Sequence, residues 1–152
     1  MAAKSPPPMK EVRGPVGFST EIWITAPLPK VWQLATKGAW LDQYFTTATS
    51  GNLDAPGRVR LSWGDISEDV EVLSAAWEKK TVFRWIAYRQ KYATRVTFGL
   101  KAKGNMTLFS IAESGWKRDP SGVDSSLHHA IGWTHFLAQL KAFAQFGVQL
   151  RG

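Results

Sequence analysis

Glu113 is the residue of this sequence whose position most directly suggests chemistry. The sequence around it alternates between apolar and polar types, and alternate residues of a strand face the same side. If Phe109 and Ile111 point into a core, Glu113 points into it as well. A carboxyl group there could bind a polar group of a ligand or act as a general acid or base. The competing interpretation is structural: Glu113 lies at the end of the sheet, solvated or capping a backbone amide.

Glu68 has the same two interpretations. Gly64-Asp65 has the chemistry of a two-residue turn between two strands. A turn centred there pairs Glu68 with Leu61 on the apolar face of the hairpin. A carboxylate in that position is unfavourable unless it has a partner. Glu68 is therefore either a tolerated structural residue or a second group that handles protons or polar atoms of a ligand.

Three histidines lie in the C-terminal segment. His129 precedes Trp133 by four residues, so a helix carries both on one face, and His129 is a candidate donor at the end of a pocket. His128 and His135 share the outer face of that helix, but two turns, ~10 Å, separate their backbones. The sequence therefore predicts no metal site.

Other catalytic or cofactor motifs are missing from the sequence. It contains no cysteine, which excludes disulfides and thiolate metal sites. No serine stands in a nucleophile elbow, and no glycine-rich phosphate loop occurs. We therefore predict no cofactor and no catalytic residue, and we favour a binding role over an enzymatic one.

Aromatic residues are abundant, with eight Trp, eight Phe and three Tyr in 152 residues. Such side chains bury large areas and also line binding cavities well. For any single apolar candidate, a place in the core is the simpler interpretation. The residues that we expect to contact a ligand are Trp40, Tyr44, Trp63, Phe83, Trp85, Phe98, Phe109, Glu113, His129, Trp133, Phe136 and Leu140.

Apolar periodicity indicates the elements that must position these residues. An alternating segment that ends at Ala26-Pro27 is followed by two short helical segments and a run of strands separated by turn residues. The last segment carries an apolar stripe at helical spacing and stops at Gly147. The expected strands are 18–25, 57–63, 66–77, 81–88, 92–101 and 106–113, and the expected helices are 28–37, 40–45 and a long one that begins at the capping sequence 121–124 and runs to Phe146.

The predicted fold class is α+β, with a curved antiparallel sheet of about six strands wrapped around the long C-terminal helix and two short helices after the first strand. Such a meander must bury one face, and only the last helix is long enough to cover it. A hollow remains between them unless side chains fill it. Leu127 and Ile131 fall off the apolar stripe of the helix, which predicts a bend or a change of face near Gly132.

The formal net charge of +7 is unevenly distributed. Residues 65–78 contain five acids and no base, whereas residues 79–103 contain eight bases and no acid. If these stretches form neighbouring strands, their charges pair across the ladder. We favour that interpretation over nucleic-acid binding.

The ends of the chain indicate one domain and an arm. Residues 1–16 are rich in Pro and Lys and are expected to form a flexible basic arm, and residues 17–152 are expected to form a single domain. No apolar run approaches the ~20 residues that span a bilayer. No signal peptide is recognisable, so we expect a cytoplasmic protein.

Several short motifs occur in a familiar order between Phe18 and Gly147. They are residues 26–32 (APLPKVW), Gly57, residues 82–85 (VFRW), residues 107–116 (TLFSIAESGW), and Gly132-Trp133 with Leu137 and Leu140. In order and spacing the chain resembles the helix-grip fold of the START-like superfamily, and in particular the branch named after the activator of the heat-shock protein 90 ATPase.

This resemblance implies a cavity for an apolar ligand between the sheet and the long helix, without settling an activity. The superfamily includes lipid and hormone carriers and polyketide cyclases. Two departures matter. The segment 40–45 (WLDQYF) only approximates the second tryptophan-rich motif of the family, and the sequence has no second domain like that of the chaperone activator, which lowers the co-chaperone interpretation.

Three functions therefore remain open. The leading one is binding of a small aromatic, acyl or polyketide-like molecule, which predicts a cavity of roughly 300–1,000 Å³. The second is a cyclase or dehydratase, which predicts that at least two of Glu113, Glu68 and His129 converge on that cavity. The third is a protein-interaction module or homodimer, which predicts a filled interior and an exposed apolar patch; Met106 and Leu108 on the outer strand face point to it.

Overall fold

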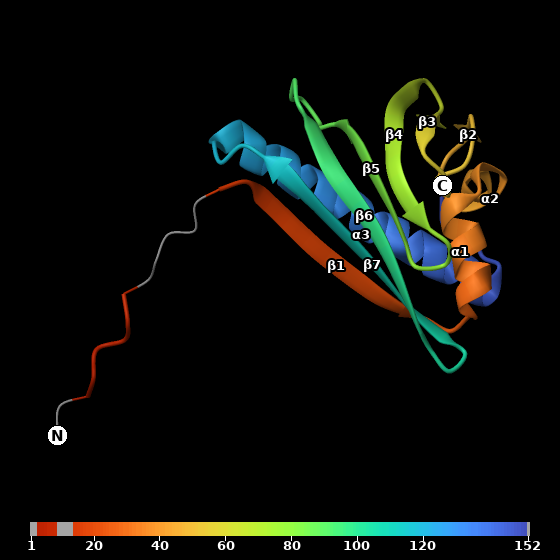
Figure 1. The fold of residues 1–152 in the computed structure, drawn as a ribbon, viewed down its shortest axis with the longest axis horizontal. Coiled ribbons are helices and arrows are strands. Elements are labelled where there is room, and N and C mark those ends of the chain that lie inside the picture. The colour runs from red at the N-terminus through yellow and green to blue at the C-terminus, as the bar shows by residue number, and fades with distance from the viewer. Residues whose placement is uncertain (1–2, 9–13, 152) are drawn as a thin grey trace.

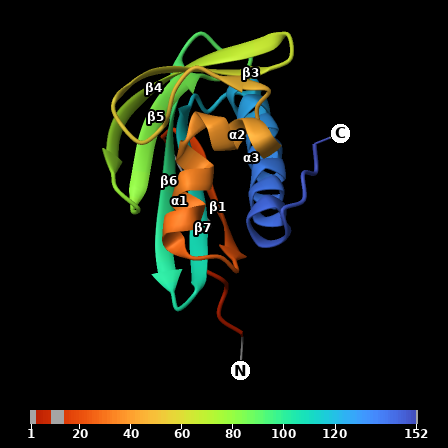
Figure 2. The same cartoon turned by 90° about the vertical axis from the view of Figure 1, so that its right-hand side faces the viewer.

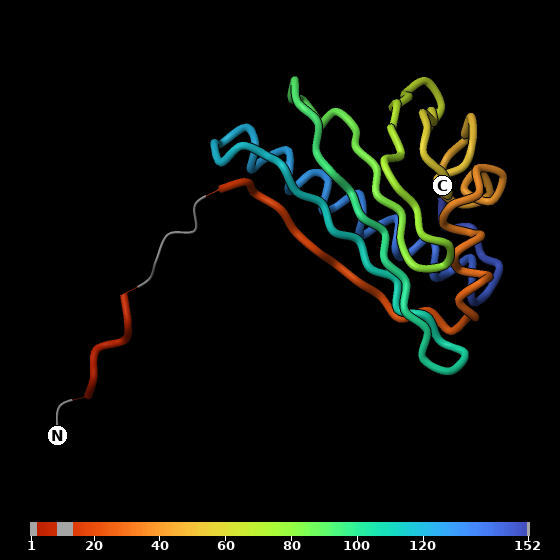
Figure 3. The backbone as a smooth tube through the Cα atoms, viewed as in Figure 1, coloured from red at the N-terminus to blue at the C-terminus, as the bar shows by residue number. Residues whose placement is uncertain are grey.

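The computed structural model describes residues 3–8 and 14–151. The predicted arm, 1–16, lies partly outside these described residues. Residues 3–8 contain no helix or strand and are exposed, and they lie away from the folded body (Figure 3). No helix within 3–8 and 14–151 combines the length and the apolar character needed to cross a membrane.

Strands and helices follow one another in an α+β order, as predicted. Seven strands form one antiparallel sheet in the order β1-β7-β6-β5-β4-β3-β2. The additional strand, β2, has two residues and lies outside the strands expected from the sequence. The elements are β1 (Val16–Ile24), α1 (Leu28–Thr36), α2 (Gly38–Tyr44), β2 (Ala48–Thr49), β3 (Gly57–Trp63), β4 (Ile66–Ala76), β5 (Lys80–Ile86), β6 (Ala93–Lys103), β7 (Met106–Trp116) and α3 (Pro120–Phe146) (Figure 1).

The turn at Gly64 sets the register of the β3–β4 hairpin. Gly64 has a φ of 61° between β3 and β4, a left-handed conformation that glycine adopts without strain. The β3–β4 ladder then pairs Trp63 with Ile66 and Leu61 with Glu68, as the sequence predicted. Glu68 therefore stands on the inner face of the sheet.

The N-cap of the long helix α3 lies two residues earlier in the sequence than predicted. We expected the cap at 121–124, but the Asp119 carboxylate accepts a hydrogen bond of 2.7 Å from the backbone N–H of Gly122. Pro120 then occupies the first turn, where its missing N–H has no cost. The helix ends, as predicted, at Gly147 in the left-handed conformation with a φ of 65°.

The expected change of face near Gly132 is wrong. Helix α3 is continuous through this residue, and its inner face continues toward the N-terminus through the half-buried His129 and the buried Ser126 and Ser125. Leu127 and Ile131 are 59% and 60% exposed and simply lie on the opposite face.

Aromatic side chains fill the space between the sheet and α3. Phe83, Phe98, Phe109 and Phe136 are fully buried, and the rings of Phe98 and Phe136 stack with centroids 5.5 Å apart. Helices α1, α2 and α3 lie on this one face of the sheet (Figure 2). The hollow expected between the sheet and the helix is therefore packed over much of its length.

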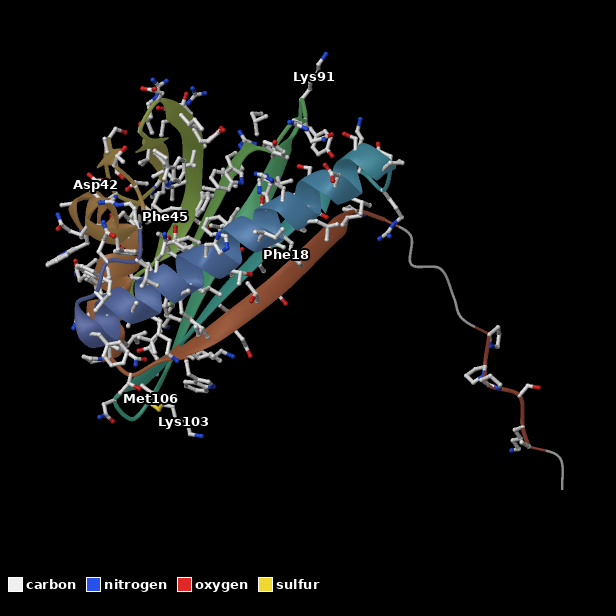
Figure 4. The ribbon with its side chains drawn as sticks, turned by 180° about the vertical axis from the view of Figure 1, so that it is seen from behind. Phe18, Asp42, Phe45, Lys91, Lys103 and Met106 are labelled. Atoms are coloured by element: carbon white, nitrogen blue, oxygen red, sulfur yellow. The ribbon has the colours of Figure 1, made fainter. Side chains whose placement is uncertain are left out.

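Charged residues occupy the outer face and pair across strands. Arg60 and Asp69 on β3 and β4 approach to 2.9 Å, and Arg84 on β5 approaches Glu71 on β4 to 2.9 Å. Of these two pairs, Arg84 with Glu71 joins the basic stretch to the acidic one as predicted, whereas Arg60 precedes both stretches. Exposed pairs of this kind contribute little stability. Met106 and Lys103 mark the end of the β6–β7 hairpin (Figure 4).

Candidate functional site

A groove of about 910 Å³ runs between α3 and the inner face of strands β3, β4 and β5. Its lining is largely aromatic. The aromatic residues of the lining are Phe45, Trp63, Trp85, Tyr88 and Trp133. Phe45 follows α2 and lies between the short helices and β4 (Figure 4). The groove thus lies beside the packed core and is bounded by the helix on one side and by the first half of the sheet on the other.

The predicted ligand-contacting residues divide into two groups in the structure. Four of them line the groove: Trp63, Trp85, His129 and Trp133. Seven others are buried behind it: Tyr44, Phe83, Phe98, Phe109, Glu113, Phe136 and Leu140.

Two of the predicted residues have distinct surroundings. The Tyr44 hydroxyl donates to the Leu34 carbonyl at 2.7 Å, and burial raises the pKa of this phenol well above its ordinary value. Trp40 lies elsewhere, in a second depression of about 470 Å³ beside Phe143 at the end of α3.

Sequence reasoning missed several residues of the lining. Ile66 could have been found, because the hairpin register that brings Glu68 to the inner face also brings Ile66 there. Leu150 and Arg151 had no signal. They enter the lining because the chain turns back after Gly147, and the Arg151 guanidinium donates to the backbone carbonyls of Thr46 and, at 3.2 Å, of Asp42.

Glu113 is the centre of a buried hydrogen-bond network. Its side chain is 1% exposed, and Trp133 Nε1–H donates to Oε1 at 2.7 Å. Trp85 Nε1–H and the Thr94 hydroxyl donate to Oε2 at 3.0 and 2.7 Å. His129 Nδ1 lies 3.1 Å from Oε1. An ionised carboxylate has only acceptors, so four donors from β5, β6 and α3 suit it.

The two ring nitrogens of His129 have different partners. The backbone N–H of Tyr88, in the β5–β6 loop, donates to Nε2 at 2.9 Å. Nε2 must therefore be the unprotonated nitrogen, and Nδ1 carries the hydrogen that points to Glu113. This bonding pattern holds the imidazole in its neutral form with both nitrogens occupied. His129 thus joins the β5–β6 loop to the Glu113 network.

This network limits the chemistry that the groove can perform. A general base needs a free lone pair within reach of the substrate proton, and neither nitrogen of His129 offers one in this arrangement. Glu113 does not reach the groove. What the network does achieve is to orient two indoles of the lining, Trp85 and Trp133, which stack with centroids 5.4 Å apart.

Glu68 is the acidic residue of the lining, and it is exposed to solvent. No ion pair within the described residues includes it. Partial burial raises the pKa of its carboxyl group, and the neighbouring Asp69 raises it further. Asp69, on the opposite face, has its pKa lowered by the hydrogen bond from Arg60.

Gly132 is the residue of α3 that widens the groove. It lies in the helix interior, and a Cβ built on it would have no neighbouring atom within 4 Å. Close packing within the chain therefore does not explain this glycine. Its missing side chain leaves open space directly beside Trp133.

Histidines also flank this part of the groove. The ring of His128 stacks on that of Tyr88 with centroids 3.7 Å apart, and His135 lines the groove further along α3. Among the described residues, no group of three or more His, Asp or Glu side chains is arranged to hold a metal ion.

Comparison with known proteins gives a family match. The sequence profile of the Activator of Hsp90 ATPase homolog 1-like protein family matches residues 25–145. No curated protein sequence matches the chain significantly.

Solved structures share the fold at low sequence identity. DynU16, a protein of the dynemicin biosynthetic locus, superposes with a TM-score of 0.78 and 21% identity over 90% of this chain, which spans only 49% of DynU16. The Aha1 dimer from Colwellia psychrerythraea gives a TM-score of 0.70 and 20% identity, covering 87% of this chain and 98% of that one. CalU16 from Micromonospora echinospora gives 0.69 and 17%, covering 84% and 73%.

Proposed function

This chain belongs to the family of Activator of Hsp90 ATPase homolog 1-like proteins, and we propose that it binds a small, largely apolar molecule in the groove between α3 and strands β3–β5. The observation that carries the proposal is the groove itself. Its volume of about 910 Å³ falls within the range of ligand sites. Its aromatic lining offers a large apolar surface with a few polar groups, which is the usual composition of such sites.

Gly132 supports this proposal independently. Glycine inside a helix is about 1 kcal/mol less favourable than alanine, and no neighbouring atom in the chain would collide with a side chain there. A glycine with that penalty and no packing reason is accounted for if the space beside it accommodates a ligand.

A catalytic role, of the cyclase or dehydratase kind, has less support. Glu68 and His129 both line the groove, as that role requires. The two nitrogens of His129 are engaged by Tyr88 and Glu113, however, so the histidine is not poised to accept a proton. Binding without chemistry accounts for the same residues with fewer requirements.

Native mass spectrometry of the purified protein tests the binding role. We expect an adduct of a small apolar molecule that disappears on acid denaturation. Gly132→Leu fills the groove and should lose the adduct, whereas Thr134→Leu places the same side chain at an exposed position of α3 outside the groove lining and should retain it. A folded Gly132→Leu protein that carries the same adduct as the wild type would contradict the proposal.

A second candidate role is self-association through the outer face of the sheet. Trp23 is 40% exposed and is the Cα partner of Leu108, and Met106 lies two residues from Leu108 on the same face. These residues form an exposed apolar patch of the kind that mediates contacts. Sedimentation velocity of the wild type and of Met106→Glu tests this role: a concentration-dependent dimer that the variant loses supports it, and a wild type that stays monomeric refutes it.

A further inference from the structure

Glu68 distinguishes the ligand class of the groove more sharply than its aromatic lining does. It stands on the inner face of β4 opposite Leu61, and Trp63 is its diagonal neighbour on the same face of β3. A diagonal pair of this kind lies within reach of a ligand group held between the two side chains. Both residues line the groove.

The other titratable groups of the lining are Tyr88, His128, His129, His135 and Arg151, and none of them forms an ion pair with this carboxylate. His129 lies on the opposite wall and is held neutral by the Tyr88 N–H and by its own bond to Glu113. The Arg151 guanidinium is bound by the backbone carbonyls of Thr46 and Asp42. No ion pair within the described residues includes Glu68.

The neighbouring acid on β4 makes the contrast plain. Asp69 has the same carboxylate chemistry, but its side chain is on the outer face and is bound by Arg60 Nε at 2.9 Å and by Arg60 Nη2 at 3.2 Å. Among the described residues, a cation therefore pairs with the acid outside the groove and none pairs with the acid inside it. Glu68 lines the groove and is exposed to solvent, so its carboxylate is accessible to a ligand cation.

The combination of an unpaired carboxylate with aromatic faces suits one chemical class. Organic ammonium ions are attracted electrostatically by the faces of Trp, Tyr and Phe rings, and their N–H groups donate charge-assisted hydrogen bonds to carboxylates. We propose that the groove selects apolar ligands that carry a protonated amine, with the ammonium group held by the Glu68 carboxylate beside the Trp63 indole. This inference rests on the proposed binding function and specifies its ligand class.

The charge of the whole chain opposes this preference only weakly. The formal net charge is +7, but charges further away than about 8 Å are largely screened at physiological ionic strength. Among the groups that line the groove, Arg151 is the cation, and it follows the C-terminal turn near Phe45 and Thr47. Its guanidinium is bound by the carbonyls of Thr46 and Asp42 and forms no ion pair with Glu68 within the described residues.

Three matched probes test the proposal in the full chain by isothermal titration calorimetry at pH 7. They are 2-naphthylmethylamine, 2-naphthylmethanol and 2-naphthoate, which share an apolar body and differ in charge. We expect the amine to bind roughly tenfold more tightly than the alcohol, corresponding to about 1.4 kcal/mol, and the naphthoate to bind most weakly. Glu68→Gln should reduce the amine to the affinity of the alcohol, while Asp69→Asn, the matched acid on the outer face, should keep the preference.

The outcomes separate this proposal from the binding function. If the alcohol binds and the amine binds no more tightly, the ligand class is refuted and the binding function stands. If the preference for the amine survives in Glu68→Gln, or if amine binding survives in Gly132→Leu, the carboxylate or the groove is not its site and the proposal fails. If none of the three probes binds the wild type, the binding function itself fails for molecules of this size and apolar character, and the ligand class fails with it.

Discussion

Glu113 and Glu68 both stand on the inner face of the same sheet, one on β7 and the other on β4. Glu113 is buried and accepts hydrogen bonds from Trp85, Trp133 and Thr94, with His129 as the fourth partner. Glu68 lines the groove and pairs with no cation of the described residues. Both side chains are carboxylates, but Glu113 is surrounded by hydrogen-bond donors, whereas Glu68 has no charged partner among the described residues.

This difference suggests a structural role for Glu113 and a role in ligand recognition for Glu68. A buried polar group whose acceptors are all used stabilises one arrangement of its partners and has nothing left for a ligand. An unpaired carboxylate in a groove retains its capacity to bind. By this reasoning the Glu113 network orients the indoles of the lining, and Glu68 is the polar group that discriminates among ligands.

Removing the Glu113 carboxylate should cause the largest loss of stability among the changes considered for these two residues and their partners. Glu113→Ala leaves two buried indole N–H groups, a hydroxyl and an imidazole without their acceptor. Breaking a buried charged network of this kind is destabilising by about 3–5 kcal/mol, and the free energy of unfolding from urea titration measures it. A loss below about 1 kcal/mol would mean that the network is not structural.

His129→Phe should cause the second-largest loss of stability, because the histidine forms hydrogen bonds with two partners. The variant removes one donor to Glu113 and the acceptor of the Tyr88 amide, while an aromatic ring still fills the space. Each buried polar group left unsatisfied costs about 1–3 kcal/mol, so we expect a loss of about 2–4 kcal/mol. Amide hydrogen exchange should also show faster exchange at Tyr88. Unchanged protection of that amide would contradict the assignment of Nε2 as its acceptor.

Thr94→Val breaks a single bond of the Glu113 network. Valine has nearly the same shape as threonine, so the change removes the hydroxyl donor and leaves the packing in place. Hydrogen bonds to charged groups contribute about 1.5–3 kcal/mol, and Glu113 keeps its three other donors, so we expect a loss near the lower value of that range. Thr97→Val, on the outer face of the same strand, is the control and should change the free energy of unfolding by less than about 0.5 kcal/mol.

Much of the fold could be predicted from the sequence, because the signals were local. The β3–β4 register followed from one glycine turn, and the end of α3 followed from Gly147. The long-range part of the site could not be predicted. Alternation put Glu113 inside the molecule, but whether it met water, a ligand or four donors depended on strands and a helix that are distant in sequence.

The position of the groove was beyond sequence reasoning for a related reason. Aromatic residues that fill a core and those that line a groove have the same composition and spacing. Phe98 and Trp85 are both on inner strand faces, yet the first is fully buried and the second reaches the groove. The contribution of Arg151 depended on the turn of the chain after Gly147, which no periodic pattern indicated.

Glu68→Gln should have the smallest effect on the free energy of unfolding, and the direction of this change is the informative result. Partial burial raises the pKa of Glu68, and Asp69 raises it further to a lesser extent. The folded chain therefore keeps this proton to higher pH than the unfolded chain does, so the contribution of Glu68 to stability falls as the pH rises through the pKa values of the two states. At pH 7 the ionised group is unfavourable for folding, and glutamine removes that penalty.

We therefore expect Glu68→Gln to be slightly more stable than the wild type at pH 7, by about 0.5 kcal/mol or less. The difference should vanish below about pH 3, where the carboxyl is protonated in both states. Asp69→Asn should behave in the opposite way, since Arg60 lowers the pKa of Asp69 and that stabilisation is present at neutral pH and lost as the pH falls. Urea titrations of the three proteins across this pH range provide the measurement. A Glu68→Gln protein that is less stable than the wild type at pH 7 would show that the chain itself already provides a partner for this carboxylate, and the contrast with Glu113 would then lose its functional meaning.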